Sequence, residues 1–284
     1  MSPIHLRVAF FLIPVLLGAG CAGMPDSATP ESSAPDSAEP ASAAQDDDLL
    51  ASTAIVGRMR PADGDIVEVA RFSRLSPGGS LAESWEPYVL QQSNPLTAYR
   101  PVSLEGQVCV EADATNGYSA LQRLIRISPQ RHPIVEWSWR VPRLASDYDP
   151  RTKRPSPRAR LMLAFHGDPE KLDFEQRVHM RMAKAITGQA MPYSSLIYVW
   201  LNGVPAGTVV PSPYTERVRL IAMDASEDRF DRWVDVQRNV REDYRRAFGE
   251  EPGDIVGVGI FTDVDSNGAP GRAYYGDISF RAPQ

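Results

Sequence analysis

Short apolar runs in which every second residue is polar recur between residues 49 and 284. In one of them Val135, Trp137 and Trp139 alternate with polar residues, which predicts a strand with one buried and one wetter face. Glycine, proline and asparagine separate the runs, as is typical of turns between strands. The predicted strands cover residues 66–72, 99–102, 107–112, 120–127, 134–141, 160–165, 196–201, 217–223, 255–262 and 273–280.

Two segments instead have the spacing of amphipathic helices. The first begins at Asp168, a capping residue followed by Pro169, and can end at Gly188. Its apolar residues recur at every fourth position, namely Phe174, Val178, Met182 and Ile186. The second can end at Gly249, and its apolar stripe comprises Trp233, Val236, Val240, Tyr244 and Phe248.

Many short strands with two isolated helices predict an all-β fold, because βαβα alternation is absent. We expect a two-sheet, jelly-roll-like sandwich decorated by two α-helices. Residues 49–284 suit one domain of this class.

The beginning of the chain has a different pattern. Arg7 precedes a ten-residue apolar run at 8–17, and small residues follow it. The run is too short to span a bilayer, which takes roughly 20 residues. These features predict a secretory signal peptide over residues 1–20.

The end of this segment resembles the lipobox of bacterial lipoproteins, in Ala19, Gly20 and Cys21. The resemblance implies acylation of Cys21 and a mature chain that starts there. Leu17 lies one position earlier than the leucine of that motif, so an ordinary signal peptide is the alternative. Ala22 stands where an inner-membrane retention signal would have aspartate, which favours the periplasmic face of the outer membrane.

Residues 21–48 form a predicted tether between the lipid anchor and the domain. Alanine, serine, proline and acidic residues dominate it, so it cannot bury enough apolar surface to fold. Subtracting the seven acidic residues and one arginine of 1–48 leaves 29 acidic and 29 basic residues in the domain. This balance argues against a nucleic-acid partner, which needs a basic surface.

Several motifs of the domain occur together as a set. They are GGSL at 78–81, WEPY at 85–88, WSWRVP at 137–142, MPY at 191–193, YVW at 198–200, DYRRAFGE at 243–250, TDVDSNG at 262–268 and YGDI at 275–278. Together they resemble an uncharacterised bacterial domain-of-unknown-function family, number 3047, over roughly residues 65–282. The resemblance implies no activity. The last two motifs are also similar to carbohydrate-binding jelly rolls of the galactose-binding type.

The turn at 263–268 matches the first half of a calcium loop, in which oxygen ligands alternate and glycine makes the bend. The twelfth position of such a loop is glutamate, but here it is Tyr274. The alternative is a turn rich in Asp and Asn between two strands. The candidate calcium ligands are Asp263, Asp265, Asn267 and Asp277. We expect no other cofactor.

Glu111 and Asp113 resemble part of the E-x-D-x-x-E signature of laminarinase-like glycosidases. Asn116 replaces the last glutamate, which removes the general acid that such hydrolysis needs. The candidate catalytic carboxylates of a hydrolase are therefore incomplete; they are Glu111, Asp113 and Glu136. Cys109, in a strand-like run, is interpreted as a buried inert thiol.

Aromatic residues beside polar ones suggest a sugar-binding platform. The candidates are Trp85, Tyr88, Trp200, Asn202, Tyr274 and Tyr275. The leading hypothesis is a lipid-anchored, non-catalytic module that binds envelope glycan or another polysaccharide. A glycan hydrolase that uses paired carboxylates is one alternative. An envelope scaffold that binds another protein is the other, and an exposed apolar patch would favour it.

Overall fold

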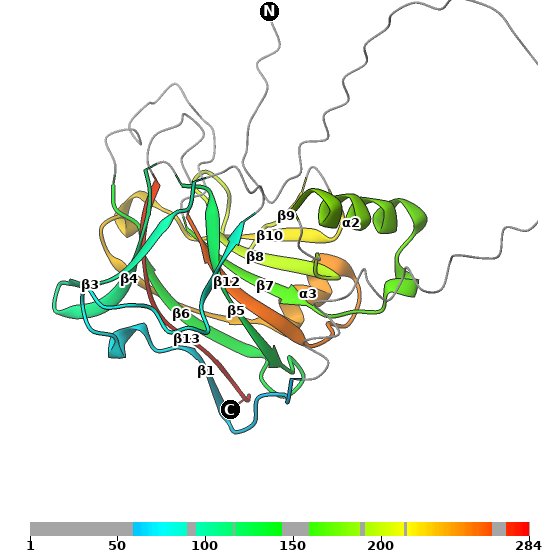
Figure 1. Cartoon of the computed structure of the whole chain (residues 1–284), viewed down its shortest axis with the longest axis horizontal. Coiled ribbons are helices and arrows are strands. Elements are labelled where there is room, and N and C mark those ends of the chain that lie inside the picture. The colour runs from blue at the N-terminus through cyan, green and yellow to red at the C-terminus, as the bar shows by residue number, and fades with distance from the viewer. Residues whose placement is uncertain are drawn as a thin grey trace, which may run out of the picture.

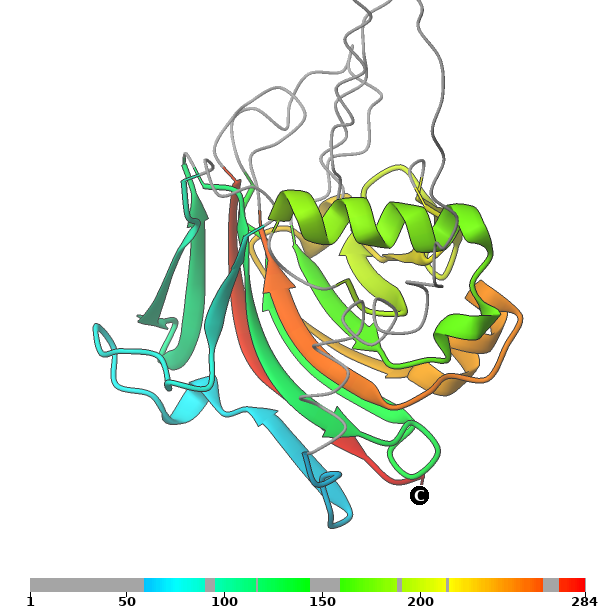
Figure 2. The same cartoon turned by 45° about the vertical axis from the view of Figure 1, so that its right-hand side comes forward.

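The computed structural model describes residues 59–89, 95–115, 117–143, 159–187, 191–212, 215–262 and 271–283. Their strands form two sheets packed as a sandwich, with two α-helices on the outside (Figure 1, Figure 2). The predicted all-β class is therefore confirmed. Cys21, the signal segment and the tether lie outside the described residues.

Sheet A has the strand order β11-β6-β13-β4-β3, and β1 pairs with the C-terminal part of β13. Every pairing within it is antiparallel. Its strands are β1 (Ile66–Ala70), β3 (Ala98–Leu104), β4 (Gln107–Ala114), β6 (Ile134–Arg140), β11 (Trp233–Asn239) and β13 (Gly271–Arg281).

Sheet B has the order β2-β5-β12-β7-β8-β10-β9. The pair β8–β10 is parallel, whereas the other pairs are antiparallel. Its strands are β2 (Glu86–Val89), β5 (Ser119–Ile127), β7 (Arg160–Phe165), β8 (Ser194–Trp200), β9 (Val209–Pro211), β10 (Val218–Met223) and β12 (Ile255–Phe261). All ten predicted strands exist; β2, β9 and β11 were not predicted.

The helices differ from the prediction at their N-terminal ends. Asp168 caps only a short 3-10 turn, η3 (Pro169–Lys171), and α2 (Phe174–Thr187) follows. Asp173 and Gln176 exchange side-chain-to-backbone hydrogen bonds at the start of α2, which makes a capping box. Two further 3-10 turns are η1 (Phe72–Arg74) and η4 (Glu227–Arg229).

The prediction of the second helix was wrong over the first half of that segment. Residues 233–239 form strand β11, and the helix α3 (Val240–Phe248) starts only after Asn239, whose side chain accepts a hydrogen bond from the Glu242 amide. The pairing of β11 with β6 overrides the helical spacing of the apolar residues. Gly249 ends α3 as predicted, in the left-handed conformation with φ 74°.

Large aromatic side chains fill the space between the sheets. Trp137 and Trp139 of β6 are buried as predicted, and they meet β8 of the opposite sheet. The ring centroids of Trp137 and Tyr198 lie 5.0 Å apart, and those of Trp139 and Trp200 lie 5.9 Å apart. These contacts lock the two sheets together face to face.

The outer faces of the two sheets differ in polarity. A second apolar cluster, which includes Ile197, Val199 and Leu220, lies on the side of sheet B away from the main core. The outward positions of β4, β6 and β13 are instead mostly charged, polar or aromatic, with Cys109 and Ile134 as exceptions. Sheet A therefore offers the polar sheet surface on which a soluble ligand can bind. Within the part of the chain that the structure describes, no helix has the length and apolarity to cross a membrane.

Candidate binding face on sheet A

Five side chains line up across the outer face of sheet A, one from each of its five consecutive strands. The register pairs Arg100 with Glu111, Glu111 with Tyr274, Tyr274 with Arg140, and Arg140 with Trp233. Because directly paired residues point to the same side of a sheet, all five lie in one row. We call Arg100, Glu111, Tyr274, Arg140 and Trp233 the cross-strand row.

The centre of the row combines an aromatic ring with a cation and a carboxylate. The Arg140 guanidinium carbon lies 6.0 Å from the centroid of the Tyr274 ring. The Tyr274 hydroxyl donates to Glu111 Oε1 at 3.3 Å. Partial burial, followed by the charge of Glu111, raises the pKa of Tyr274 above its ordinary value, so this hydroxyl stays protonated at neutral pH. The ring is thus held in place with one edge toward a charged acceptor.

Two donors in the row have no hydrogen-bond partner among the described residues. They are Arg140 Nε and Trp233 Nε1. The other end of the Arg140 guanidinium donates to Glu105 Oε1 at 3.1 Å, from the turn between β3 and β4. Buried donors are normally paired, and both atoms have almost no accessible surface, so a ligand could reach them only after neighbouring side chains move.

A carboxylate pair lies next to the row, with an arginine on either side. Arg100 Nη2 lies 3.6 Å from Glu111 Oε2 and 3.7 Å from Asp113 Oδ2. Arg272 lies 3.6 Å from Glu111 and 3.2 Å from Asp113. Hydrogen bonds from Thr115 and the charge of Arg272 outweigh partial burial and lower the pKa of Asp113. Asp113 is therefore held in its ionised form, and arginines contact both carboxylates.

The candidate catalytic carboxylates fit hydrolysis poorly. A general acid needs a raised pKa, whereas that of Asp113 is lowered. Glu136 lies on the same face of sheet A, but its Oε1 accepts from Arg281 Nε at 2.8 Å. All three candidates are thus held by arginine. This arrangement suits recognition of a ligand better than proton transfer.

The predicted aromatic platform does not form as a unit. Trp200 and Tyr275 are buried in the core, because they point inward from β8 and β13. The Tyr275 hydroxyl bonds to Thr262 Oγ1 and to the Phe261 carbonyl. Trp85 and Tyr88 are also buried. Of the six predicted ligand residues, Tyr274 lies on the face of sheet A, and the exposed Asn202 follows β8 in sheet B.

Sequence reasoning missed Trp233 and Arg140. Trp233 was predicted to lie in a helix, and Arg140 was predicted only to lie on the solvent-facing side of a strand. Alternation within a single strand does not show which strands pair or in which register. The sequence therefore held no signal that β11, β6 and β13 are neighbours. A bulge between Tyr275 and Ile278 also shapes it. A Cβ at Gly276 would lie 2.0 Å from Ser138 Oγ, so a larger residue where β13 passes β6 would force the Ser138 hydroxyl to move.

The calcium prediction stays a prediction. Asp263, Asp265 and Asn267 lie outside the described residues. The fourth candidate, Asp277, accepts hydrogen bonds from the backbone N–H and the hydroxyl of Ser73, at 2.8 and 2.6 Å. In the described ranges, no three His, Cys, Asp or Glu side chains gather into a metal-binding group.

Cys109 is a buried free thiol, which confirms its interpretation as a core residue. Burial, and secondarily the charge of Glu111, raises its pKa to about 11. The thiolate that would react is therefore scarce at neutral pH.

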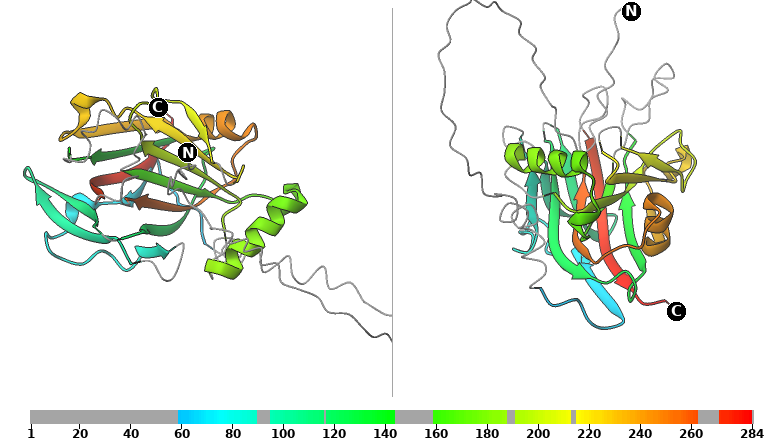
Figure 3. Two further views of the ribbon diagram at one scale, coloured as in Figure 1. Left: turned by 90° about the horizontal axis from the view of Figure 1, so that it is seen from above. Right: turned by 90° about the vertical axis from the view of Figure 1, so that its right-hand side faces the viewer.

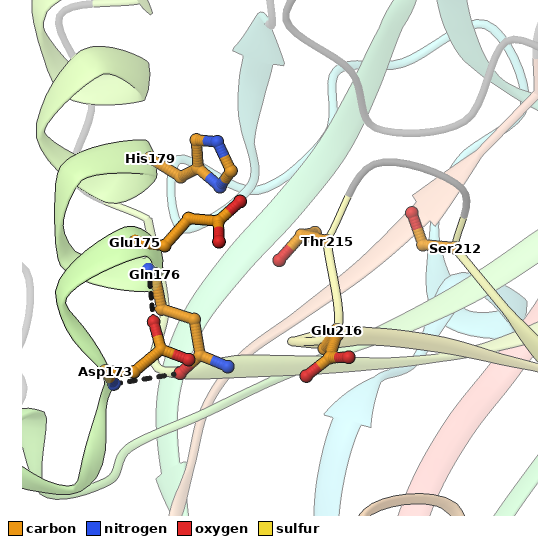
Figure 4. Close-up of a pocket in the computed structure, with 7 residues that line it drawn as sticks. All are labelled: Asp173, Glu175, Gln176, His179, Ser212, Thr215 and Glu216. Atoms are coloured by element: carbon orange, nitrogen blue, oxygen red, sulfur yellow. Dashed lines mark hydrogen bonds between the residues drawn. The ribbon is translucent and has the colours of Figure 1, made fainter.

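A separate polar cleft lies between the start of α2 and the segment that joins β9 to β10 (Figure 4). It encloses about 320 Å³. Asp173, Glu175 and Glu216 give it an acidic lining, and His179 lies at its rim on α2. Asp173 is already used to cap α2, so this cleft offers less free binding chemistry than sheet A.

The fold is a two-sheet β-sandwich, and one sheet carries a row of charged and aromatic side chains on its outer face. The chain belongs to the family described as protein of unknown function DUF3047, whose profile matches residues 83–279. This confirms the resemblance seen in the motifs.

Other comparisons add little. No curated protein matched the chain. Among solved structures, it is similar to a xylan-binding module, CBM15, with 10% sequence identity and a TM-score of 0.32. The match covers 77% of this chain and 97% of that module. A likeness of this size carries no argument about the ligand.

Proposed function

We propose that this protein is a non-catalytic glycan-binding module, held in the cell envelope by a lipid on Cys21. The cross-strand row carries the proposal. Tyr274 and Trp233 offer flat apolar surface on either side of Arg140, and Glu111 lies at the edge of the tyrosine ring. Sugar rings present both apolar C–H faces and hydroxyl groups, so they match a site of aromatic surface with a few placed polar groups.

The arginines around the row indicate which glycans it takes. The contacts of Arg100 with both carboxylates are longer than hydrogen bonds, and its side chain is 60% exposed. Its guanidinium donors are therefore free to bind acceptor oxygens of a ligand. Guanidinium groups bind carboxylates and phosphates in paired hydrogen bonds, so the row favours glycans that carry acidic substituents.

The anchor rests on the sequence of residues 1–48. The apolar run, the small residues before Cys21 and the tether support export and acylation. Mass spectrometry of the protein purified from membranes tests this part. We expect an acylated N-terminal Cys21; an unmodified start beyond Cys21 would reduce the anchor to a plain secretion signal.

Affinity electrophoresis in gels that contain neutral or acidic polysaccharides tests the glycan part. We expect retardation in at least one acidic polysaccharide gel, with and without a chelator of calcium. The double variant Tyr274→Ala/Trp233→Ala should bind the polysaccharide with an affinity lower by about tenfold or more, because two ring contacts are lost. Thermal unfolding verifies that this variant is folded.

Phe174→Ala serves as the matched control, because Phe174 is an exposed aromatic residue on α2, away from sheet A. It should bind polysaccharide as the unchanged protein does. If no gel retains the unchanged protein, or if the double variant is retained equally, the glycan proposal is wrong.

A further inference from the structure

Helix α2 turns an apolar face toward solvent. Phe174 is 74% exposed and Met182 is 39% exposed, although both are large apolar residues. With Val178 between them, they lie at spacing four, so they follow one side of the helix. This side is the stripe that the sequence predicted, but it is not the side that packs on the domain.

The helix is held to the domain by a different residue. Met180 is buried and packs with Leu172 and Tyr193 in a small satellite cluster. Met180 lies two residues from both Val178 and Met182, on a different side of the helix. Viewed from above, α2 projects outward beyond the edges of the sheets (Figure 3). Its amphipathicity is thus inverted relative to a helix that covers a core.

Basic residues lie along one edge of the exposed stripe, by helical spacing. Arg177, Arg181 and Lys184 follow the first turn of α2, whereas Glu175 is its one acidic residue. Long basic side chains beside an apolar stripe are typical of helices that lie in the plane of a membrane surface. There the apolar residues enter the acyl boundary and the cations stay with anionic headgroups.

We propose that α2 docks on the anionic surface of a lipid bilayer. This inference deepens the proposed function, because it rests on the acylation of Cys21 to bring the domain to that membrane. A chain as long as residues 22–58 spans roughly 30 Å as a coil. That reach lets α2 touch the bilayer in which the lipid is inserted. Contact through α2 would fix the orientation of the domain relative to the bilayer.

Vesicle binding of the unacylated chain tests the proposal. The chain from Ala22 to Gln284 contains all described residues and lacks Cys21, so neither failed acylation nor failed glycan binding affects the result. Vesicles of phosphatidylethanolamine with phosphatidylglycerol supply an anionic surface, and phosphatidylcholine vesicles a neutral one. We expect sedimentation with the anionic vesicles at low salt, at least about fivefold less with the neutral ones, and loss at high salt.

Two double variants distinguish binding through the stripe on α2 from binding through any exposed apolar residue. Phe174→Gln/Met182→Gln should weaken anionic vesicle binding by about tenfold or more, because two apolar contacts with the acyl region are lost. Ile66→Gln/Leu96→Gln removes two other exposed apolar residues, at 60% and 54% exposure, and should leave binding unchanged. Met182→Cys, labelled with an environment-sensitive dye, should brighten on the anionic vesicles.

Several results would overturn the proposal. One is no binding to anionic vesicles at low salt, and another is equal binding of both double variants. Equal binding to neutral vesicles would contradict the role of the basic residues. A concentration-dependent dimer that Phe174→Gln/Met182→Gln abolishes would show that a second copy, not a bilayer, covers the stripe.

Discussion

Two aspartates of this protein bind arginines in opposite settings. Asp243 of α3 is almost fully buried, and it accepts hydrogen bonds from Tyr198 at 2.9 Å and from Arg238 at 2.8 and 2.5 Å. Arg246 adds a further bond at 2.9 Å. Asp113 of β4 lies on the surface of sheet A instead, with arginines 3.2 and 3.7 Å away.

The difference shows how burial divides similar chemistry into two roles. The short bonds around Asp243 join β8, β11 and α3, so every acceptor site is used to hold elements together. The longer contacts around Asp113 leave arginine donors exposed. The first cluster therefore stabilises the fold, and the second is able to exchange its contacts for a ligand.

The largest effect is expected at the buried aspartate. Asp243→Ala should lower the free energy of unfolding by about 3–5 kcal/mol, because it removes the buried acceptor that the partly buried Arg238 and the buried Tyr198 hydroxyl share. Urea unfolding measures this. Asp235→Ala, an exposed position on β11, is the control and should change stability by less than about 0.5 kcal/mol. A loss below about 1 kcal/mol at Asp243 would contradict its structural role.

The next largest difference is expected between variants of the two arginines, Arg238 and Arg100, in their loss of stability. Arg238→Gln should cost about 1–3 kcal/mol, since Asp243 keeps Arg246 and Tyr198 but loses two bonds. Arg100→Gln should cost less than about 0.5 kcal/mol, as is usual for exposed ion pairs. The same Arg100 variant should nevertheless weaken retention by acidic polysaccharide. Equal losses of stability in the two variants would remove the distinction between the clusters.

The smallest effect concerns pH. The folded-state pKa of Asp113 is lowered, so its contribution to stability is present above its unfolded pKa of about 3.9 and is lost as pH falls through the folded value. Asp113→Asn should therefore be less stable than the unchanged protein at pH 7, and the gap should close below about pH 4. Urea unfolding at several pH values tests this; a gap that is constant with pH would contradict it.

The strands were predicted well from the sequence, because the alternation of apolar and polar residues within one segment is enough to define a strand. The prediction failed at β11, where Trp233, Val236 and Val240 fit helical spacing and only the pairing with β6 decides. The helix α2 was also predicted, but its orientation was not. The spacing of Phe174 and Met182 defines one side of the helix without showing whether that side faces the domain or solvent.

The candidate site was less predictable than the fold. Glu111, Asp113 and Tyr274 were named in advance, but their arrangement depends on the register of β4 against β13. Arg140 and Trp233 join them only through two further strand pairings. A row of side chains that crosses five strands is a property of tertiary structure, and no local pattern encodes it.

The buried Cys109 makes the fold independent of its redox surroundings. If Cys21 carries the proposed lipid, Cys109 has no second thiol of the same chain to pair with, so neither an oxidising nor a reducing compartment would change the covalent structure of the domain. Aromatic packing holds the two sheets of the sandwich together, and the domain should fold equally well under oxidising and reducing conditions.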